Sequence, residues 1–262
     1  MSNEVPALRA ALRVMVQLCE SRDAQGVTEL GKALGLNKNM VFRILRTLDE
    51  EGWVVRENES AKYRMSLRPF HYASMPVGRM NLRLAALEPL KELWTRTGES
   101  TYLAILDEDR VMYLENFDAT GSIKIAGKVG GRYFLHCSAP GKALIAYAPD
   151  AYLEDLARKG FERLTPKSIC RLDKLRDDLA LVRERGFAVD IEEYATGLMC
   201  LAAPVFDHTG RAAGTVGTSV LTLNYSVRRM LNELGPLVKA AARTVSSAMG
   251  ASEKVLSTAP QK

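Results

Sequence analysis

Apolar residues recur every three or four positions through the first fifty residues, which is the spacing of one face of a helix. This pattern predicts helices over residues 6–19, 29–34 and 38–51. Thr28 is the expected N-cap of the second helix, and Asn37 that of the third. Gly35 lies between them, where a left-handed residue would end the second helix. Two helices joined by a short turn that contains glycine predict a helix-turn-helix.

The spacing changes to alternation after the third helix. Residues 53–56 and 62–67 alternate apolar and polar side chains on either side of a polar turn, which predicts a β-hairpin. A hairpin that follows the second helix of a helix-turn-helix is a wing. We therefore expect a winged helix-turn-helix domain over residues 1–67.

Breaker residues separate this domain from the rest of the chain. Pro69, Pro76 and Gly78 predict a linker over residues 68–77, and a helix over residues 79–97 follows it. Strands are predicted over residues 102–106, 111–114, 187–191, 201–206 and 212–220, and helices over residues 140–147, 172–185 and 226–249, the last capped by Asn224. We expect a linker region over 68–97, an α/β domain with a mainly antiparallel sheet over 98–250, and a flexible tail over 251–262.

The third helix has an apolar stripe and an opposite polar side. Val41, Ile44 and Leu45 belong to the stripe. Asparagine and arginine can each make paired hydrogen bonds to base edges, and lysine suits a phosphate. A solvated helix face would carry similar residues, so this helix alone leaves both interpretations open; the partner helix and the wing favour DNA. The candidate DNA-binding residues are Thr28, Lys38, Asn39, Met40, Phe42, Arg43 and Arg46 on the helices and Arg56, Lys62 and Arg64 on the wing.

Composition adds little to this picture. The chain is 47% apolar and 26% charged, as a folded protein is, and its net charge is +5. Residues 1–66 carry ten basic and nine acidic side chains, so bulk charge does not itself indicate nucleic acid. No apolar run is long enough to predict a membrane span, and no signal peptide is predicted. Four widely spaced cysteines without a C-x-x-C pair argue against a zinc site and fit a cytoplasmic protein.

Three stretches carry a resemblance to a known family. VTELGKALGLNKNMVFRILRTLDEEGWV, LHCSAPGKALIAY and GFAVDIEEYATGLMCLAAPVFDHTG together resemble bacterial regulators of the isocitrate-lyase-regulator (IclR) family. The residues that hold the family's spacing in the last stretch are Asp190, Glu192, Glu193, Gly197, Cys200, Ala202 and Pro204. The resemblance covers residues 8–249. It implies a winged helix-turn-helix, a linker helix, a GAF-like effector-binding domain and a dimer that can pair into tetramers.

The resemblance also implies an effector pocket. Its residues by position are Ser138, Ala139, Pro140, Gly141, Asp190, Leu198, Cys200, Gly217 and Ser219. Pro140 has no N–H to donate to a carboxylate, and Gly217 replaces a hydroxyl residue. Both departures favour an effector larger or more apolar than a two- or three-carbon acid, such as an aromatic acid. At the DNA end, Asn37-Lys-Asn-Met replaces the family's common proline-lysine-serine-threonine, so operator preference does not carry over from relatives.

Other patterns suggest chemistry but have plainer explanations. Asp190, Glu192 and Glu193 could bind a metal, but strand alternation turns Glu193 away from the other two. We expect Glu192 and Glu193 to accept hydrogen bonds from the backbone or from arginine. His136 and Cys137 would point to opposite faces of a strand, which argues against a thiol nucleophile.

Two further residues are weighed in the same way. Gly141-Lys142 lacks the rest of a phosphate loop, so Lys142 is expected on the surface. Trp94 on the linker helix is expected either in an oligomer contact or in a contact within the chain. The sequence thus predicts a regulator that binds a near-palindromic DNA operator and a small-molecule effector, with no cofactor, metal or catalytic residue. The alternatives are a GAF-like enzyme and a ligand-binding adaptor that does not bind DNA.

Overall fold

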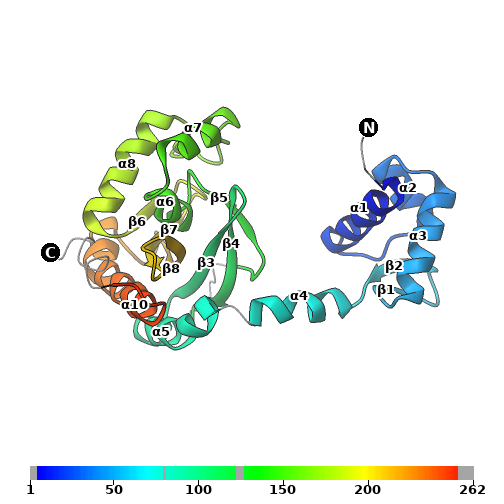
Figure 1. Ribbon diagram of the computed structural model, residues 1–262, viewed down its shortest axis with the longest axis horizontal. Helices are drawn as coiled ribbons and strands as arrows, with labels where there is room; N and C mark the ends of the chain where they lie inside the picture. Colours follow the sequence, from blue (N-terminus) through cyan, green and yellow to red (C-terminus); the bar gives the residue numbers. More distant parts are fainter. Residues whose placement is uncertain (1–4, 79–80, 122–126, 253–262) are drawn as a thin grey trace. The chain divides into compact units, whose positions relative to one another are not determined.

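The structure is a computed structural model that describes residues 5–78, 81–121 and 127–252. The chain divides into two compact units, Met1–Val77 and Gly78–Lys262, each of which is described by itself. The elements of the first unit are α1 (Pro6–Glu20), α2 (Val27–Leu34), α3 (Lys38–Glu50), β1 (Val54–Arg56), β2 (Tyr63–Met65) and α4 (Arg68–Gly78) (Figure 1). Its core consists of Val14, Leu18, Leu30, Val41, Leu45, Val54 and Tyr63. The predicted helix-turn-helix and wing are therefore confirmed.

The ends of α2 show one correct and one wrong prediction. Gly35 ends the helix with a φ of 65°, as expected. Thr28 is not the N-cap, because the helix begins two residues earlier than predicted, at Val27, and its N-cap is Gly26. The Glu29 carboxylate reaches back and accepts a hydrogen bond from the Gly26 N–H (2.8 Å), so it caps the first turn in place of a hydroxyl.

Residues 68–78 form the helix α4, so Pro69 does not interrupt the chain there as the breaker pattern predicted. Ser66 Oγ accepts a hydrogen bond from the Arg68 N–H (3.1 Å), which caps the helix start. Pro69 lies in the first turn, where a missing N–H breaks no helical hydrogen bond. The ring of Tyr72 stacks on Trp53 with centroids 5.9 Å apart, which fixes α4 against the wing.

The second unit is built on one antiparallel sheet. Its strands are β3 (Ser100–Asp107), β4 (Arg110–Phe117), β5 (Arg132–Phe134), β6 (Ala188–Ile191), β7 (Leu198–Phe206) and β8 (Ala212–Leu221). They lie in the order β5-β4-β3-β8-β7-β6, and every neighbouring pair is antiparallel. The mainly antiparallel sheet is thus confirmed. The short strand β5 was not predicted.

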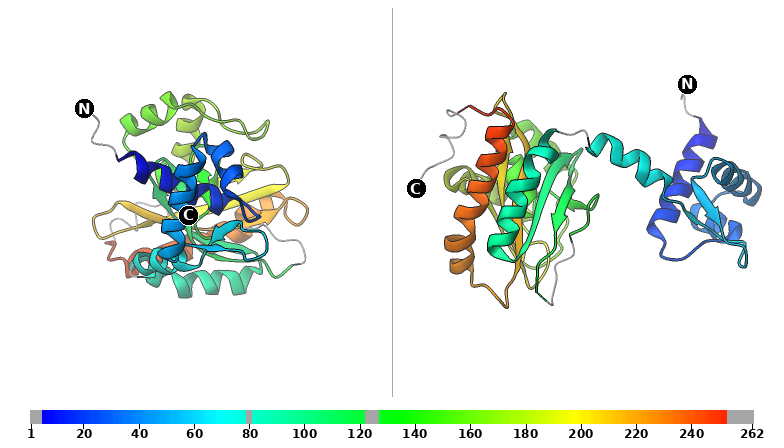
Figure 2. Two further views of the ribbon diagram at one scale, coloured as in Figure 1. Left: turned by 90° about the vertical axis from the view of Figure 1, so that its right-hand side faces the viewer. Right: turned by 90° about the horizontal axis from the view of Figure 1, so that it is seen from below.

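Helices cover both faces of this sheet. On one face lie α5 (Asn81–Thr97) and α10 (Gly235–Ala248), and on the other α6 (Ala139–Ile145), α7 (Asp150–Arg158) and α8 (Leu172–Arg185) (Figures 1 and 2). Side chains alternate along the strands, so that Leu103 and Leu201 meet α5 and α10 while Tyr102 and Cys200 face α6. The helix α7 was not predicted. Among the described residues no helix is both long and apolar enough to span a bilayer.

The closing helix differs from the prediction in two ways. Its N-cap is Ser226, whose Oγ accepts a hydrogen bond from the Arg229 N–H (3.2 Å), and not Asn224. It is also interrupted, because α9 (Val227–Arg229) passes into a π-helical segment, Met230–Leu234, before α10. Pro236 follows in the first turn of α10 and has no N–H to continue an α-helical ladder, which accounts for the local change of hydrogen bonding.

Candidate nucleic-acid interface and ligand cavity

The exposed side of α3 carries the polar residues that its pattern placed there. Asn37 Oδ1 accepts a hydrogen bond from the Asn39 N–H (2.8 Å), which starts the helix as predicted. Val41 and Leu45 are fully buried, so the opposite positions face away from the domain. Asn39 and Arg43 are exposed, and within the described ranges neither side chain makes a hydrogen bond or an ion pair. Both are therefore available to another molecule.

The other candidates on the helices are exposed as well. Phe42 is 49% exposed and Met40 is 37% exposed, which leaves two apolar side chains beside the polar ones. Lys38 is exposed at the start of α3, and Thr28 at the start of α2. Arg46 is partly engaged, because its Nε donates to Glu50 Oε1 (2.8 Å) one turn later.

The wing presents its basic side chains on both strands. Arg56 and Arg64 are exposed on β1 and β2. Lys62 lies just before β2, and its Nζ is 2.9 Å from Glu29 Oε1 on α2. This half-exposed ion pair connects the wing to α2, a contact that the sequence pattern did not predict. Lys62 is thus held close to the start of α2.

A cavity of about 150 Å³ opens in the second unit between the sheet and the start of α6. Six of the nine predicted effector residues line it: Ser138, Pro140, Asp190, Leu198, Cys200 and Ser219. The described residues that complete the lining are Ser100, Tyr102, Tyr113, Asn116, Gly127, Tyr133, Tyr194 and Ala195. The structure therefore brings most of the predicted set together.

Four tyrosines in this lining were not predicted. The rings of Tyr102 and Tyr113 stack with centroids 4.6 Å apart, those of Tyr113 and Tyr133 lie 4.5 Å apart, and Tyr133 meets Tyr194 at 5.6 Å. They come from β3, β4, β5 and the turn after β6, so no local pattern connects them. We name these four residues the tyrosine wall.

Asp190 is the charged member among the described lining residues. Its Oδ1 accepts hydrogen bonds from the backbone N–H groups of Glu193 (2.7 Å) and Tyr194 (3.4 Å). Its Oδ2 is buried and has no hydrogen-bond partner in the described structure. Burial, together with the nearby Glu193 carboxylate, raises the pKa of Asp190 to about 7.

Comparisons with known proteins show the family of the chain. The family model of the bacterial transcriptional regulator IclR C-terminal domain matches residues 75–247, and that of the IclR helix-turn-helix domain matches residues 7–58. The chain belongs to the IclR family. Regulator KdgR of Escherichia coli (strain K12) is 32% identical over 95% of this chain and 94% of its own length.

Solved structures of the IclR family share the fold. The crystal structure of the Thermotoga maritima IclR has a TM-score of 0.76 at 26% identity and covers 93% of this chain and 98% of its own. An IclR homologue from Microbacterium hydrocarbonoxydans, complexed with 4-hydroxybenzoate, has a TM-score of 0.81 at 23% identity, with 94% and 100% covered. The protein is thus a transcriptional regulator with a DNA-binding helix-turn-helix domain and an effector-binding C-terminal domain.

Three of the predicted effector residues lie outside the lining of this cavity. Ala139 is fully buried in α6. A Cβ on Gly141 would lie 2.4 Å from the Leu135 backbone, so this glycine allows α6 to pack closely on the chain before it. A Cβ on Gly217 would lie 2.3 Å from Tyr102 Cζ. Gly217 therefore makes room for a tyrosine that does line the cavity.

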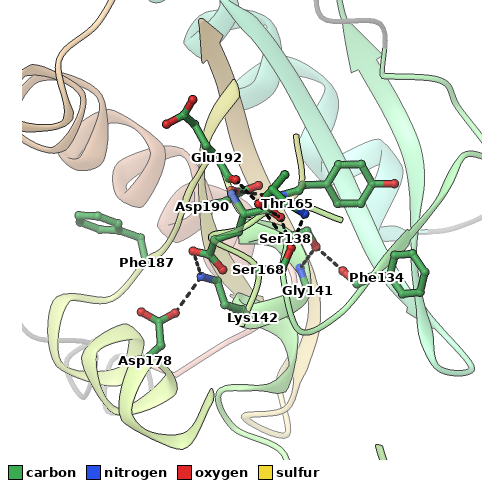
Figure 3. Close-up of polar contacts among 12 residues, drawn as sticks. Phe134, Ser138, Gly141, Lys142, Thr165, Ser168, Asp178, Phe187, Asp190 and Glu192 are labelled. Atoms are coloured by element: carbon green, nitrogen blue, oxygen red, sulfur yellow. Dashed lines mark hydrogen bonds and ion pairs between the residues drawn. The ribbon is translucent and has the colours of Figure 1, made fainter. Parts of the chain in front are cut away.

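Lys142 is buried, so the prediction of a surface residue is wrong. Its side chain is 0% exposed, and its Nζ lies 2.6 Å from Glu193 Oε1 and 2.9 Å from Asp178 Oδ2 on α8 (Figure 3). The pattern failed here because α6 is covered on every side, by the sheet and by α8. A buried ammonium is tolerated because two carboxylates compensate its charge.

Glu192 and Glu193 are held at a turn, as expected: Glu192 accepts a backbone hydrogen bond, and the cation that pairs with each is a lysine and not an arginine. Glu192 has a φ of 59°, which takes it out of the strand β6. Its Oε1 accepts from the Gly197 N–H (2.9 Å), and its other oxygen pairs with Lys167. Glu193 pairs with Lys142. The three carboxylates do not converge, and no metal-binding group of His, Cys, Asp and Glu occurs in the described ranges.

The thiols and the linker tryptophan make contacts within the chain. Cys137 is buried, and burial raises the pKa of its thiol to about 12, so that it stays protonated. His136 Nε2 lies 2.9 Å from the Glu162 carbonyl oxygen and is engaged there. Trp94 Nε1 donates to the Asp118 carbonyl oxygen (2.7 Å), which is the contact within the chain that was one of its two expected roles.

Proposed function

We propose that this regulator reads its operator with the exposed side of α3. Asn39 and Arg43 would contact base edges, and Lys38 with the wing residues Arg56 and Arg64 would contact phosphates. The observation that carries this proposal is the exposure of Asn39 and Arg43 without partners in the described chain. The exposed Phe42 and Met40 add apolar contact area beside them.

The regulator would act as a homodimer in the cytoplasm, with tetramers formed from dimers. The outer side of α1 supports this assembly, because Val5, Leu8, Leu12 and Val16 are each 55–60% exposed. Four large apolar side chains on one surface are better covered than left in water. A two-fold assembly would bind a near-palindromic operator, since its two recognition helices would enter equivalent half-sites.

The effector would bind in the cavity of the second unit. A cavity of about 150 Å³ has the size that holds one benzene ring. The tyrosine wall would contact the flat side of such a molecule. Effector binding would change DNA affinity by favouring one arrangement of the units over another, with α4 and α5 as the connecting segments.

The proposal is that of a regulator and not of a catalyst. The protonated thiol of Cys137 and the engaged His136 support it, because neither is set to act as a nucleophile or base. The exposed Asn39 and Arg43 also favour a DNA-binding regulator over a ligand-binding adaptor, because an adaptor would not need residues that contact base edges.

Recovery of genomic DNA tests this function. Purified protein is mixed with sheared DNA of its source genome at physiological salt, and the bound fragments are sequenced. We expect a shared near-palindrome in the wild type and its loss in the double variant Asn39→Ala/Arg43→Ala. Arg158→Ala serves as the control, because it removes one positive charge from the exposed surface of the second unit. Random fragments from the wild type would refute the proposed DNA recognition.

A further inference from the structure

One oxygen in the cavity lacks a partner. Asp190 is 1% exposed, and its Oδ1 already accepts two backbone hydrogen bonds. Oδ2 is buried and accepts none from the described residues. A buried carboxylate oxygen without a donor costs free energy, so the site is incomplete until a donor reaches it.

The tyrosine wall also favours a ligand group that carries hydrogen or positive charge. Four rings in series, 4.5–5.6 Å between neighbouring centroids, form part of the cavity lining. The face of an aromatic ring carries partial negative charge and attracts positive or hydrogen-bearing groups. The wall and Asp190 therefore favour a ligand that brings hydrogen or positive charge.

Two groups near the start of α6 that could bind an anion, the Gly141 N–H and the Lys142 ammonium, are already engaged. Pro140 has no N–H, and the Gly141 N–H donates to Ser138 Oγ (3.2 Å). The ammonium of Lys142 is turned to Glu193 and Asp178. A carboxylate effector would face Asp190 without gaining these donors.

The charges in the group formed by Asp190, Glu193, Lys142, Asp178 and Arg185 do not balance, and Asp178 and Arg185 of this group are partly exposed. Lys142 and Arg185 bring two positive charges, and Arg185 lies 3.9 Å from Asp178. Asp178, Asp190 and Glu193 bring three acidic groups. The acid without a basic partner is Asp190, the one that lines the cavity.

We propose that the effector is a single-ring molecule that donates a hydrogen bond, from an ammonium, amide or hydroxyl group, to Asp190 Oδ2 while its ring lies on the tyrosine wall. This inference rests on the proposed function, since it names the ligand class of the same cavity. It keeps the aromatic ring expected from the sequence and replaces the acid group by a donor. The pKa of Asp190, about 7, means that the carboxylate form prevails at pH 8.

Three ligands of one shape and different charge test the proposal. Benzylamine is a cation at pH 8, benzamide is a neutral donor, and benzoate is an anion. Each is titrated into the full-length protein at pH 8 by isothermal calorimetry. We expect benzylamine or benzamide to bind about ten- to a hundredfold more tightly than benzoate, the range of a hydrogen bond to a charged group. Benzoate binding equally well, or no binding by any of the three, would overturn the proposal.

Two variants assign the effect to Asp190. In Asp190→Asn, benzylamine should lose its advantage over benzoate. Glu192→Gln is the matched control, because this acid lies two residues on, outside the cavity lining, and pairs with Lys167. An unchanged ranking in Asp190→Asn, with the variant's circular dichroism spectrum that of the wild type, would also overturn the proposal. The wild-type ranking decides the matter if Asp190→Asn does not fold.

Failure of this inference can be separated from failure of the proposed function. The ligand titrations need no DNA, and the genomic recovery needs no ligand. A recovered near-palindrome together with preferred benzoate binding would leave DNA recognition standing and reject the donor ligand. Random DNA fragments together with preferred benzylamine binding would reject DNA recognition and leave the donor ligand standing.

Discussion

Asp190→Asn should stabilise the protein, by an amount that increases with pH. Asparagine keeps an oxygen for the backbone N–H groups of Glu193 and Tyr194, and it does not ionise. In the wild type, burial first and the Glu193 carboxylate second raise the pKa of Asp190 from 3.8 to about 7. The folded protein therefore holds a proton on Asp190 that the unfolded chain releases near pH 4.

The sign and size of the effect follow from proton linkage. The favourable contribution of protonated Asp190 is complete below pH 3.8 and is lost as the pH rises through about 7. The difference between these pKa values corresponds to about 4 kcal/mol of unfolding free energy. About 2–3 kcal/mol of this loss should fall between pH 5 and pH 8. The variant avoids that loss, so its advantage over the wild type should increase by this amount.

Urea unfolding at pH 5, 6, 7 and 8, followed by circular dichroism, measures the difference. Glu192→Gln is the control of opposite sign, because hydrogen bonds from Lys167 and Gly197 lower the pKa of Glu192. The unfolding free energy of Glu192→Gln relative to the wild type should therefore not increase with pH. A difference between Asp190→Asn and wild type that is flat from pH 5 to pH 8 would show that Asp190 is ionised throughout. The account of a buried oxygen without a partner would then be wrong.

Three other substitutions address separate parts of the molecule. Arg43→Ala should weaken operator binding by about 1–3 kcal/mol if the side chain makes a paired base contact; mobility-shift titrations against the recovered operator check this, and an unchanged affinity would contradict the assignment. Lys142→Met should lower the unfolding free energy by about 3–5 kcal/mol, because Glu193 would stay buried without its cation; a loss below 1 kcal/mol in urea unfolding would count against the buried pair. Gly217→Ala should cost about 1–3 kcal/mol or more, since the new methyl group would overlap the ring of Tyr102; a stability equal to the wild type in thermal unfolding would disagree with that contact.

Local patterns predicted the first domain well, because its signals are local. The cap at Asn37 and the left-handed Gly35 act on the helices next to them, and both are where they were expected. The failures are nearby as well, at the start of α2 and at Pro69. In α2, the Glu29 carboxylate caps the first turn in place of the Thr28 hydroxyl. In α4, Pro69 was interpreted as a helix breaker, although proline is compatible with the first turn of a helix.

Part of the cavity lining could not be predicted from the sequence. Six lining residues followed from the family's spacing, but the tyrosine wall did not, because β3, β4 and β5 bring its members together only after the sheet has formed. Lys142 failed for the same reason. Its place at a helix start, without the rest of a phosphate loop, predicted an exposed position, whereas the packing of α6 against α8 places Asp178 beside its ammonium.

The ion pairs of the buried Lys142 also explain why Asp190 is the acid without a cationic partner. Glu193 donates its backbone N–H to Asp190 while its carboxylate pairs with Lys142, so one turn contains both an acid with a cation and an acid without one. Lys142 is further shared with Asp178 of α8, and no hydrogen bond or ion pair joins it to Asp190 in the described structure. The ion pair therefore fixes the turn and leaves Asp190 Oδ2 without a hydrogen-bond donor at the cavity. A ligand that supplies a donor satisfies this oxygen without disturbing the pair, whereas an anion would require either a proton on Asp190 or a rearrangement of Lys142.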